Sequence, residues 1–304
     1  MEMLKLINII RITTIVMTWL SGIILNSSIV AVYIGDQAYG QHFSVCDKIF
    51  LSTALLNIVQ QCFICVNDIL YYYALYLMPA KEMSILLYIS NCSLIYGSFW
   101  YSAWLSIYYF LTLVKCSHHF FLQLKKTLSS SIVQILITTL LVIVFLSAPC
   151  IWAMDVAFPQ NETINQSGGN YQITINLPFT LINLVCGCCI PFLATLFCIG
   201  HSVASLLDHV RRVYQNVSQF TSSPQIQGLL RAARTMTLQL TLNTVLCVTV
   251  SSTFLISPTV TLSGLIQTTI IMSFPSAQAM TLILGNPKLR DGLFCRAVPS
   301  RVWN

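Results

Sequence analysis

The chain has 304 residues, of which 56% are hydrophobic and only 8% are charged; its net charge is +6 and its mean hydropathy is +0.76. This composition excludes a soluble domain with a charged surface, and so few charges cannot form a phosphate-binding face for nucleic acid. The length accommodates about seven membrane spans of roughly twenty residues with short connections.

Three spans are predicted in the first half of the chain, at 12–34, 49–73 and 83–114. The first follows the short segment that ends at Arg11, carries no charge, and contains Gly22 and Asn26, residue types that mediate contacts between membrane helices. The second span carries Asp68 toward its far end. The third runs directly into a basic flank that begins at Lys115, which is typical of a helix leaving the bilayer on its cytoplasmic side.

Four further spans and a short basic tail are predicted in the second half, at 128–154, 176–207, 232–256, 260–284 and 285–304. The hydrophilic connection after the fourth span holds glycosylation sequons at Asn161 and Asn165. Pro178 and Pro191 are expected to kink the fifth span. The last two spans come from one long uncharged run, which we divide at Pro258. The prediction is therefore a single all-α transmembrane domain of seven helices.

The basic residues indicate which ends of the spans face the cytosol. Three of the 15 fall on the N-terminal side, namely Lys5, Arg11 and Lys81. The remaining twelve fall on the side of the tail: Lys48, Lys115, Lys125, Lys126, Arg211, Arg212, Arg231, Arg234, Lys288, Arg290, Arg296 and Arg301. This asymmetry predicts a plasma-membrane protein with an extracellular N-terminus and a cytoplasmic tail. The same orientation places the sequons outside, where glycosylation occurs.

Groups that could perform chemistry inside the membrane are scarce. Asp68 lies near an outer helix end and His201 near an inner one; the seventh span has no lysine for a retinal Schiff base, and no paired carboxylates or internal repeat occur. Most of the twelve cysteines lie in apolar runs, without zinc-ligand spacing, although Cys295 in the tail is a candidate for palmitoylation. We therefore expect no enzymatic activity and no bound metal or cofactor. The layout is that of a G-protein-coupled receptor, with a small-solute transporter as the alternative.

Short motifs along nearly the whole chain carry a family resemblance. The third span ends in Tyr108-Tyr109-Phe110, so the Asp-Arg-Tyr of rhodopsin-type receptors is missing. The motifs instead resemble those of the bitter taste receptors (type 2 taste receptors): Gly22-Ile23 with Asn26, Asp47 with Ile49, Leu105-Ser106, Tyr109-Phe110-Leu111, Ser117-His118, Pro191-Phe192, Arg231-Ala232 with Arg234, Pro275-Ser276, and 282–290. Departures at Asn57, Asp208, Leu229 and Gln278 indicate a divergent member. The related vomeronasal type 1 receptors are the alternative family.

The resemblance implies that an amphipathic, bitter-tasting small molecule binds from outside between the spans. The positions that match the family's pocket are Asp68, Asn91, Ile95, Tyr96, Thr268 and Ile271. Asp68, as an acid near the outer rim, is suited to pairing with a cationic ligand. The alternatives are that Asn91 and Tyr96 hydrogen-bond within the bundle, that Ile95 and Ile271 only pack, and that Asp68 faces water.

The resemblance also implies a gustducin-like heterotrimeric G protein at the cytoplasmic face, and membrane lipid around the bundle. The matching positions at that face are Tyr109, Lys115, His118, Arg231 and Arg234. The alternative for the basic residues is that they only set the topology. Of the two sequons, Asn161 matches the family's glycan position, and Asn165 is the secondary candidate.

Overall fold

The computed structural model describes residues 2–73, 81–113, 119–157, 172–216, 224–255 and 262–297. The long helices are α1 (Glu2–Ala38), α2 (Val45–Tyr73), α3 (Lys81–Leu113), α4 (His119–Ser147), α7 (Ile190–Asn216), α8 (Pro224–Leu255) and α9 (Leu262–Gly285). The shorter elements are α5 (Cys150–Ala153), the antiparallel strands β1 (Met154–Ala157) and β2 (Gln172–Ile175), α6 (Leu177–Leu184), the π-helical turn η2 (Val185–Cys189), and α10 (Pro287–Ala297).

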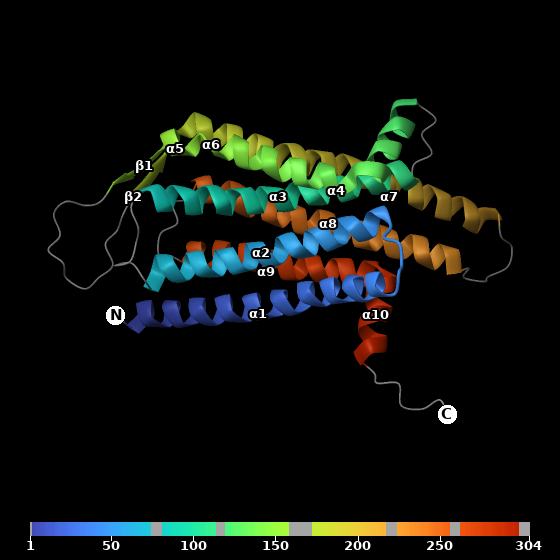
Figure 1. Ribbon diagram of the computed structural model, residues 1–304, viewed down its shortest axis with the longest axis horizontal. Coiled ribbons are helices and arrows are strands. Elements are labelled where there is room, and N and C mark those ends of the chain that lie inside the picture. Colours follow the sequence, from blue (N-terminus) through green and yellow to red (C-terminus); the bar gives the residue numbers. More distant parts are fainter. Residues whose placement is uncertain are drawn as a thin grey trace.

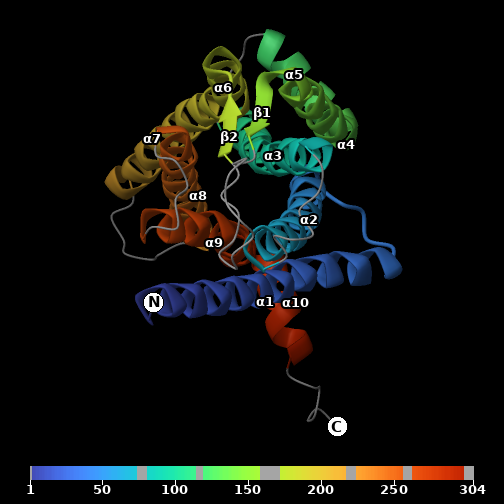
Figure 2. The same ribbon diagram turned by 90° about the vertical axis from the view of Figure 1, so that its left-hand side faces the viewer.

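The long helices lie side by side along one axis (Figure 1). Since α6, η2 and α7 follow one another without a break, the described residues make seven long helical passages. Helix α3 packs against α2, α4 and α7, while α1 packs against α2 and α9. The N-terminus and the two strands lie at one end, here called the sheet end, and α10 projects sideways past α1 at the other, here called the α10 end (Figures 1 and 2). The predicted seven-helix bundle is confirmed.

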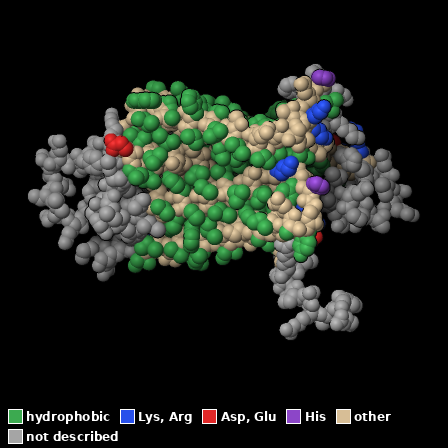
Figure 3. Space-filling view, viewed as in Figure 1, with side chains coloured by type: hydrophobic (Ala, Val, Ile, Leu, Met, Phe, Trp, Pro, Cys, Tyr) green, Lys and Arg blue, Asp and Glu red, His purple; other side chains and the backbone are tan. Residues whose placement is uncertain are grey.

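The outer surface of the bundle is apolar. Figure 3 shows hydrophobic side chains along its length and charged side chains toward its two ends; Phe145 and Trp152 are 79% and 83% exposed. Within the described residues, five helical stretches are long and apolar enough to cross a membrane: Ile9–Ala38, Val45–Asp68, Phe121–Ala153, Leu177–Arg212 and Ser263–Gly285. Helices α3 and α8, with 33 and 32 residues, run beside them. The chain is therefore a multi-pass membrane protein.

The prolines of the fifth passage act differently from one another. Pro178 lies in the first turn of α6, where its missing N–H costs no hydrogen bond, so the predicted kink at this residue is wrong. Pro191 is the second residue of α7 and directly follows η2, in which the Ile190 N–H donates to the Val185 carbonyl five residues back. The proline therefore coincides with a π-helical bulge, which is a common way for a helix to absorb an irregularity.

Polar side chains join α1, α2 and α9 in the bundle interior. The buried Asn26 amide donates to the Pro275 carbonyl at 3.3 Å, and the buried Asn57 amide donates to Asn26 Oδ1 at 3.1 Å. A Cβ added to Gly22 would overlap the Gln61 amide, so glycine is required for this approach of α2 to α1. The predicted role of Gly22 and Asn26 in helix contacts is confirmed, and Asn57 finds its polar partner within the bundle.

Candidate functional site

The six residues predicted to bind a ligand lie on three helices in the half of the bundle nearest the sheet end. Asp68 lies near the end of α2, three of the others lie in the first half of α3, and Thr268 and Ile271 lie in the first half of α9. The α3 residues are Asn91, Ile95 and Tyr96. Helices that follow one another in the chain run in alternate directions, which is why the end of α2 and the beginnings of α3 and α9 lie at the same end.

Ile95, Tyr96 and Ile271 come together in one apolar cluster. Ile95 and Tyr96 are buried, and Ile271 packs against the same group. The other buried members are Phe99, Ile143, Cys188, Leu246, Val250 and Phe274. Gly187 of η2 faces the Tyr96 ring, and a Cβ added to this glycine would lie 2.5 Å from ring carbons. The π-helical turn thus brings backbone against an aromatic ring at the centre of the predicted ligand site.

Asp68 lies next to a charge that the sequence analysis placed outside the first span. Arg11 belongs to α1, is completely buried, and acts electrostatically on the Asp68 carboxylate. One helical turn after Arg11 and one turn before Asp68, Ile15 and Ile64 pack together in a small cluster, and Ile271 packs against it. The first span is predicted to begin at residue 12, directly after Arg11, whereas α1 begins at Glu2, so Arg11 lies within this helix and is buried against the bundle. A buried guanidinium needs such a counter-charge.

Two polar residues complete the predicted site. Asn91 is half-buried, and its Oδ1 has no hydrogen-bond partner within the described part of the chain. Asp68 Oδ2 likewise accepts no hydrogen bond from the described residues. Thr268 is half-buried on α9. Buried acceptors without donors are unfavourable, so they favour a ligand or water molecule that donates a hydrogen bond.

A cavity of about 410 Å³ opens at the α10 end, among α2, α3, α8 and the junction of α9 with α10. Its lining residues are Ser44, Cys46, Asp47, Phe50, Tyr109, Ala232, Thr235, Gly285, Asn286, Pro287 and Lys288. Of the predicted G-protein contacts, Tyr109 lines this cavity, whereas Arg231 and Arg234 lie beside it on α8, half-buried and exposed respectively. Lys115 and His118 lie outside the described residues, as do the sequon residues Asn161 and Asn165.

Two residues of the cavity wall, Asp47 and Lys288, belong to a charged cluster that was not predicted from the sequence. Lys288 Nζ lies 3.0 Å from Asp36 Oδ2 and 3.7 Å from Asp47 Oδ2. The Tyr33 hydroxyl donates to Asp47 Oδ1 at 3.1 Å, and Lys288 lies 5.5 Å from the centroid of the Tyr33 ring. We call Tyr33, Asp36, Asp47 and Lys288 the Lys288 cluster. It joins α1, α2 and the start of α10 by charge and by a cation–π contact.

The beginning of α2 explains the position of Asp47 in this cluster. Ser44 precedes the helix, and its backbone N–H and hydroxyl donate to Asp47 Oδ2 at 3.0 and 2.8 Å. The Asp47 N–H donates back to Ser44 Oγ at 3.2 Å. This reciprocal capping holds the carboxylate at the first turn of α2. The sequence did contain a signal for this cluster. Asp36 and Asp47 flank the connection between the first two predicted spans, and Lys288 follows the last span, so opposite charges lie on the same predicted side of the membrane.

Comparisons with known proteins match nearly the whole chain to one family. A model of the family described as taste receptor protein (TAS2R) matches residues 3–297. The chain is similar to taste receptor type 2 member 9 of Macaca mulatta, with 27% identity over 276 residues that cover 88% of this chain and 87% of the relative. For member 9 of Homo sapiens the identity is 27% over 286 residues, covering 89% and 87%. For taste receptor type 2 member 40 of Gallus gallus it is 28% over 202 residues, covering 64% of each.

Proposed function

The chain belongs to the taste receptor (TAS2R) family, and we propose that it is a G-protein-coupled receptor that detects bitter-tasting small molecules. The observation that carries the proposal is the family match over residues 3–297, which includes all but the first residue of the described helical passages. The apolar outer surface of the bundle agrees with a receptor embedded in a membrane. The matches described above do not support the vomeronasal and transporter alternatives.

We assign the agonist to the sheet end of the bundle, among Asp68, Asn91, Ile95, Tyr96, Thr268 and Ile271. The apolar cluster around Tyr96 supplies hydrophobic contact, and the acceptors of Asn91 and Asp68 that have no donor in the described ranges supply polar contact. This combination suits an amphipathic molecule that carries a hydrogen-bond donor or a positive charge. An agonist activates only if it binds the active arrangement more tightly than the resting one.

We assign the G protein to the α10 end, at the cavity lined by Tyr109 and flanked by Arg231 and Arg234. Lys115 and His118 belong to the same proposed contact. In this orientation the N-terminus is extracellular, the tail is cytoplasmic and the protein resides in the plasma membrane, as the distribution of basic residues favours. Asn161 and Asn165 then lie outside and are candidates for glycosylation. A gustducin-like G protein is the proposed partner by family membership.

Calcium imaging tests the function directly. Cells that express the full chain with a promiscuous G-protein α-subunit should raise cytosolic calcium in response to members of a panel of bitter compounds. Cells that lack the receptor or the α-subunit are the controls. A surface-labelled receptor that responds to no compound would count against the taste assignment, and solute uptake independent of the α-subunit would indicate a transporter instead.

A variant of Asp68 tests the ligand site. Asp68→Asn keeps the side-chain shape but removes the charge, so we expect cationic agonists to lose about tenfold in potency because a charge-assisted contact is lost. Neutral agonists, measured on the same cells, are the matched control and should keep their potency. Equal losses for both classes would show that Asp68 acts through Arg11 and the packing of α1 rather than by contacting the ligand.

A further inference from the structure

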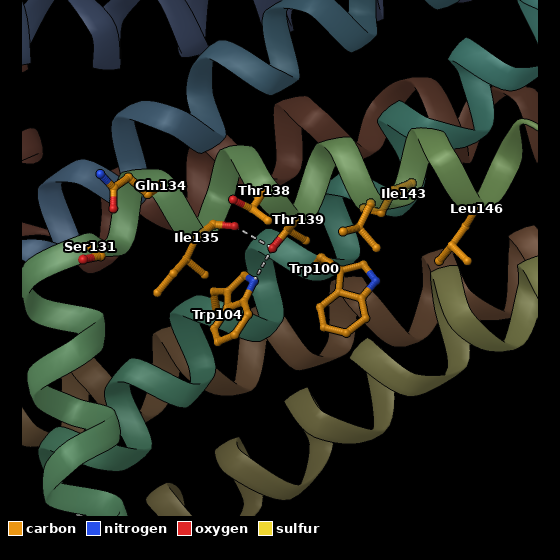
Figure 4. Close-up of a pocket in the computed structure, with 10 residues that line it drawn as sticks. Trp100, Trp104, Ser131, Gln134, Ile135, Thr138, Thr139, Ile143 and Leu146 are labelled. Carbon is orange, nitrogen blue, oxygen red and sulfur yellow. Dashed lines mark hydrogen bonds between the residues drawn. The ribbon is translucent and has the colours of Figure 1, made fainter.

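A groove lies between α3 and α4. Its volume is about 360 Å³. Helix α3 contributes Trp100 and Trp104, and α4 contributes a series of residues from Ser131 to Leu146 (Figure 4). These α4 residues span roughly 22 Å along the helix axis at 1.5 Å per residue. We call this feature the α4 groove.

The α4 groove opens toward the surrounding lipid. Helix α4 packs against α3 and, to a lesser extent, α2, which leaves its other faces at the surface of the bundle. Val142 and Leu146, on the rim of the groove, are 50% and 41% exposed. This surface lies within the apolar stretch Phe121–Ala153, which is suited to crossing a membrane. Whatever fills the groove therefore comes from the bilayer.

The two tryptophans present flat, apolar surfaces to the groove. The Trp100 indole N–H donates to the Cys186 carbonyl at 3.2 Å. The Trp104 indole N–H donates to Thr139 Oγ1 at 3.1 Å (Figure 4). Their ring centroids are 6.5 Å apart, with an angle of 38° between the planes. Because the protein satisfies both N–H groups, the rings have no polar requirement that a lipid must meet.

The end of the groove nearest the α10 end is polar but uncharged. Helix α4 bends at Ser131, where its first part leaves the bundle (Figure 1), so the groove begins at this bend. Gln134, one turn farther in, is exposed, and its side chain makes no hydrogen bond within the described part of the chain. Among the described residues that line the groove, none carries a charge. An amide at this depth favours a single hydroxyl group as its partner.

We propose that the α4 groove binds a membrane sterol. The rigid, flat ring system lies against Trp100 and Trp104, and its hydroxyl meets Gln134 and Ser131 at the level of the lipid headgroups. The apolar tail then extends along Val142 toward Leu146. A phospholipid fits less well, because the lining offers no cation for its phosphate and a flexible acyl chain gains less from flat walls. The bound sterol covers polar atoms that otherwise face lipid and packs α4 against α3.

A groove-filling variant tests where the sterol binds. The full-length receptor is reconstituted in phosphatidylcholine nanodiscs and labelled with a photoreactive analogue of cholesterol, and the labelled peptide is identified by mass spectrometry. We expect saturable labelling in 97–104 or 131–146, competed by cholesterol. Val142→Trp should abolish that labelling, whereas Val144→Trp, at a residue that is 47% exposed but outside the groove lining, should not. Equal labelling of both variants, or labelling confined to other helices, would overturn the proposal.

A second variant tests the polar end. Wild-type receptor should bind cholesterol about fivefold more tightly than its 3α-hydroxyl epimer, because only one epimer directs its hydroxyl at Gln134. Gln134→Leu should remove this preference without abolishing binding, since the ring contacts remain. If diacylglycerol or additional phosphatidylcholine competes as effectively as cholesterol, the groove binds lipids in general, and the sterol site is contradicted. Thermal unfolding of each variant in the same nanodiscs checks that it is folded.

Discussion

The two ends of the bundle handle buried charge in different ways. At the α10 end, Lys288 has two carboxylate partners, and Asp47 is also held by Tyr33 and by the capping of Ser44. At the sheet end, the buried Arg11 acts electrostatically on Asp68, and one oxygen of that carboxylate has no hydrogen-bond partner in the described residues. A carboxylate held by a cation, a hydroxyl and a helix cap, as Asp47 is, keeps one geometry, whereas a buried carboxylate oxygen without a donor, as in Asp68, favours a new partner. A rigid end and an adaptable end therefore coexist in one bundle, as the proposed receptor requires.

The largest effect should come from breaking the pair at the sheet end. Arg11→Met leaves the Asp68 carboxylate without its counter-charge in an apolar setting, so we expect a loss of about 3 kcal/mol in stability. Thermal unfolding in detergent would measure it. Arg11→Met combined with Asp68→Leu should recover most of the loss, because an apolar pair replaces the ionic one. A double variant no more stable than Arg11→Met would show that Arg11 has another essential partner.

A smaller loss should follow from a change midway between the two ends. Ser102 Oγ accepts hydrogen bonds from the side-chain amides of Gln239 and Gln278, at 3.0 and 3.1 Å. Ser102→Ala leaves both buried donors without that partner, so we expect a loss of about 2 kcal/mol, seen as a lower unfolding temperature. Ser106→Ala is the control, since this hydroxyl donates only to the Ser102 carbonyl within its own helix. Equal effects would show that the bonds between helices contribute nothing beyond local packing.

The smallest effect should come from the Lys288 cluster. Lys288→Ala removes a partly exposed cation from two carboxylates, so we expect a loss of about 1 kcal/mol, less than for a fully buried pair because solvent screens the charges. Arg290→Ala removes a cation whose partner, Asp291, is exposed, and should cost under about 0.5 kcal/mol. Raising the salt concentration should shrink the difference between the two variants. A loss for Arg290→Ala as large as for Lys288→Ala would contradict the distinction between cluster and surface pair.

Several features of the fold and site were predictable from local sequence. The apolar runs predicted a seven-helix membrane bundle, and Gly22 and Asn26 predicted a close helix contact, which Asn26 makes with Pro275 and Asn57. The kink predicted at Pro178 was wrong, because a proline in the first turn of a helix breaks no hydrogen bond. The position of a proline within its helix depends on where the helix begins, and the sequence showed that boundary only approximately.

The charge pairs could not be predicted in the same way. Arg11 and Asp68 are separated by most of two helices, and Lys288 is far in sequence from Asp36 and Asp47. The sequence suggested that Lys288 and the two acids share one face of the membrane, but it gave no distances. Asp68 is an example. The sequence left two interpretations for this acid, contact with a ligand or exposure to water, and the structure shows that it also interacts electrostatically with Arg11.

The amino-acid sequence by itself determined that the chain crosses a membrane repeatedly, since hydropathy is a local property and each span must satisfy its own backbone hydrogen bonds. Only the tertiary structure decided which polar side chains meet, because that depends on the rotation and separation of helices distant in sequence. The Arg11–Asp68 pair, the Lys288 cluster and the α4 groove all arise at contacts between such helices.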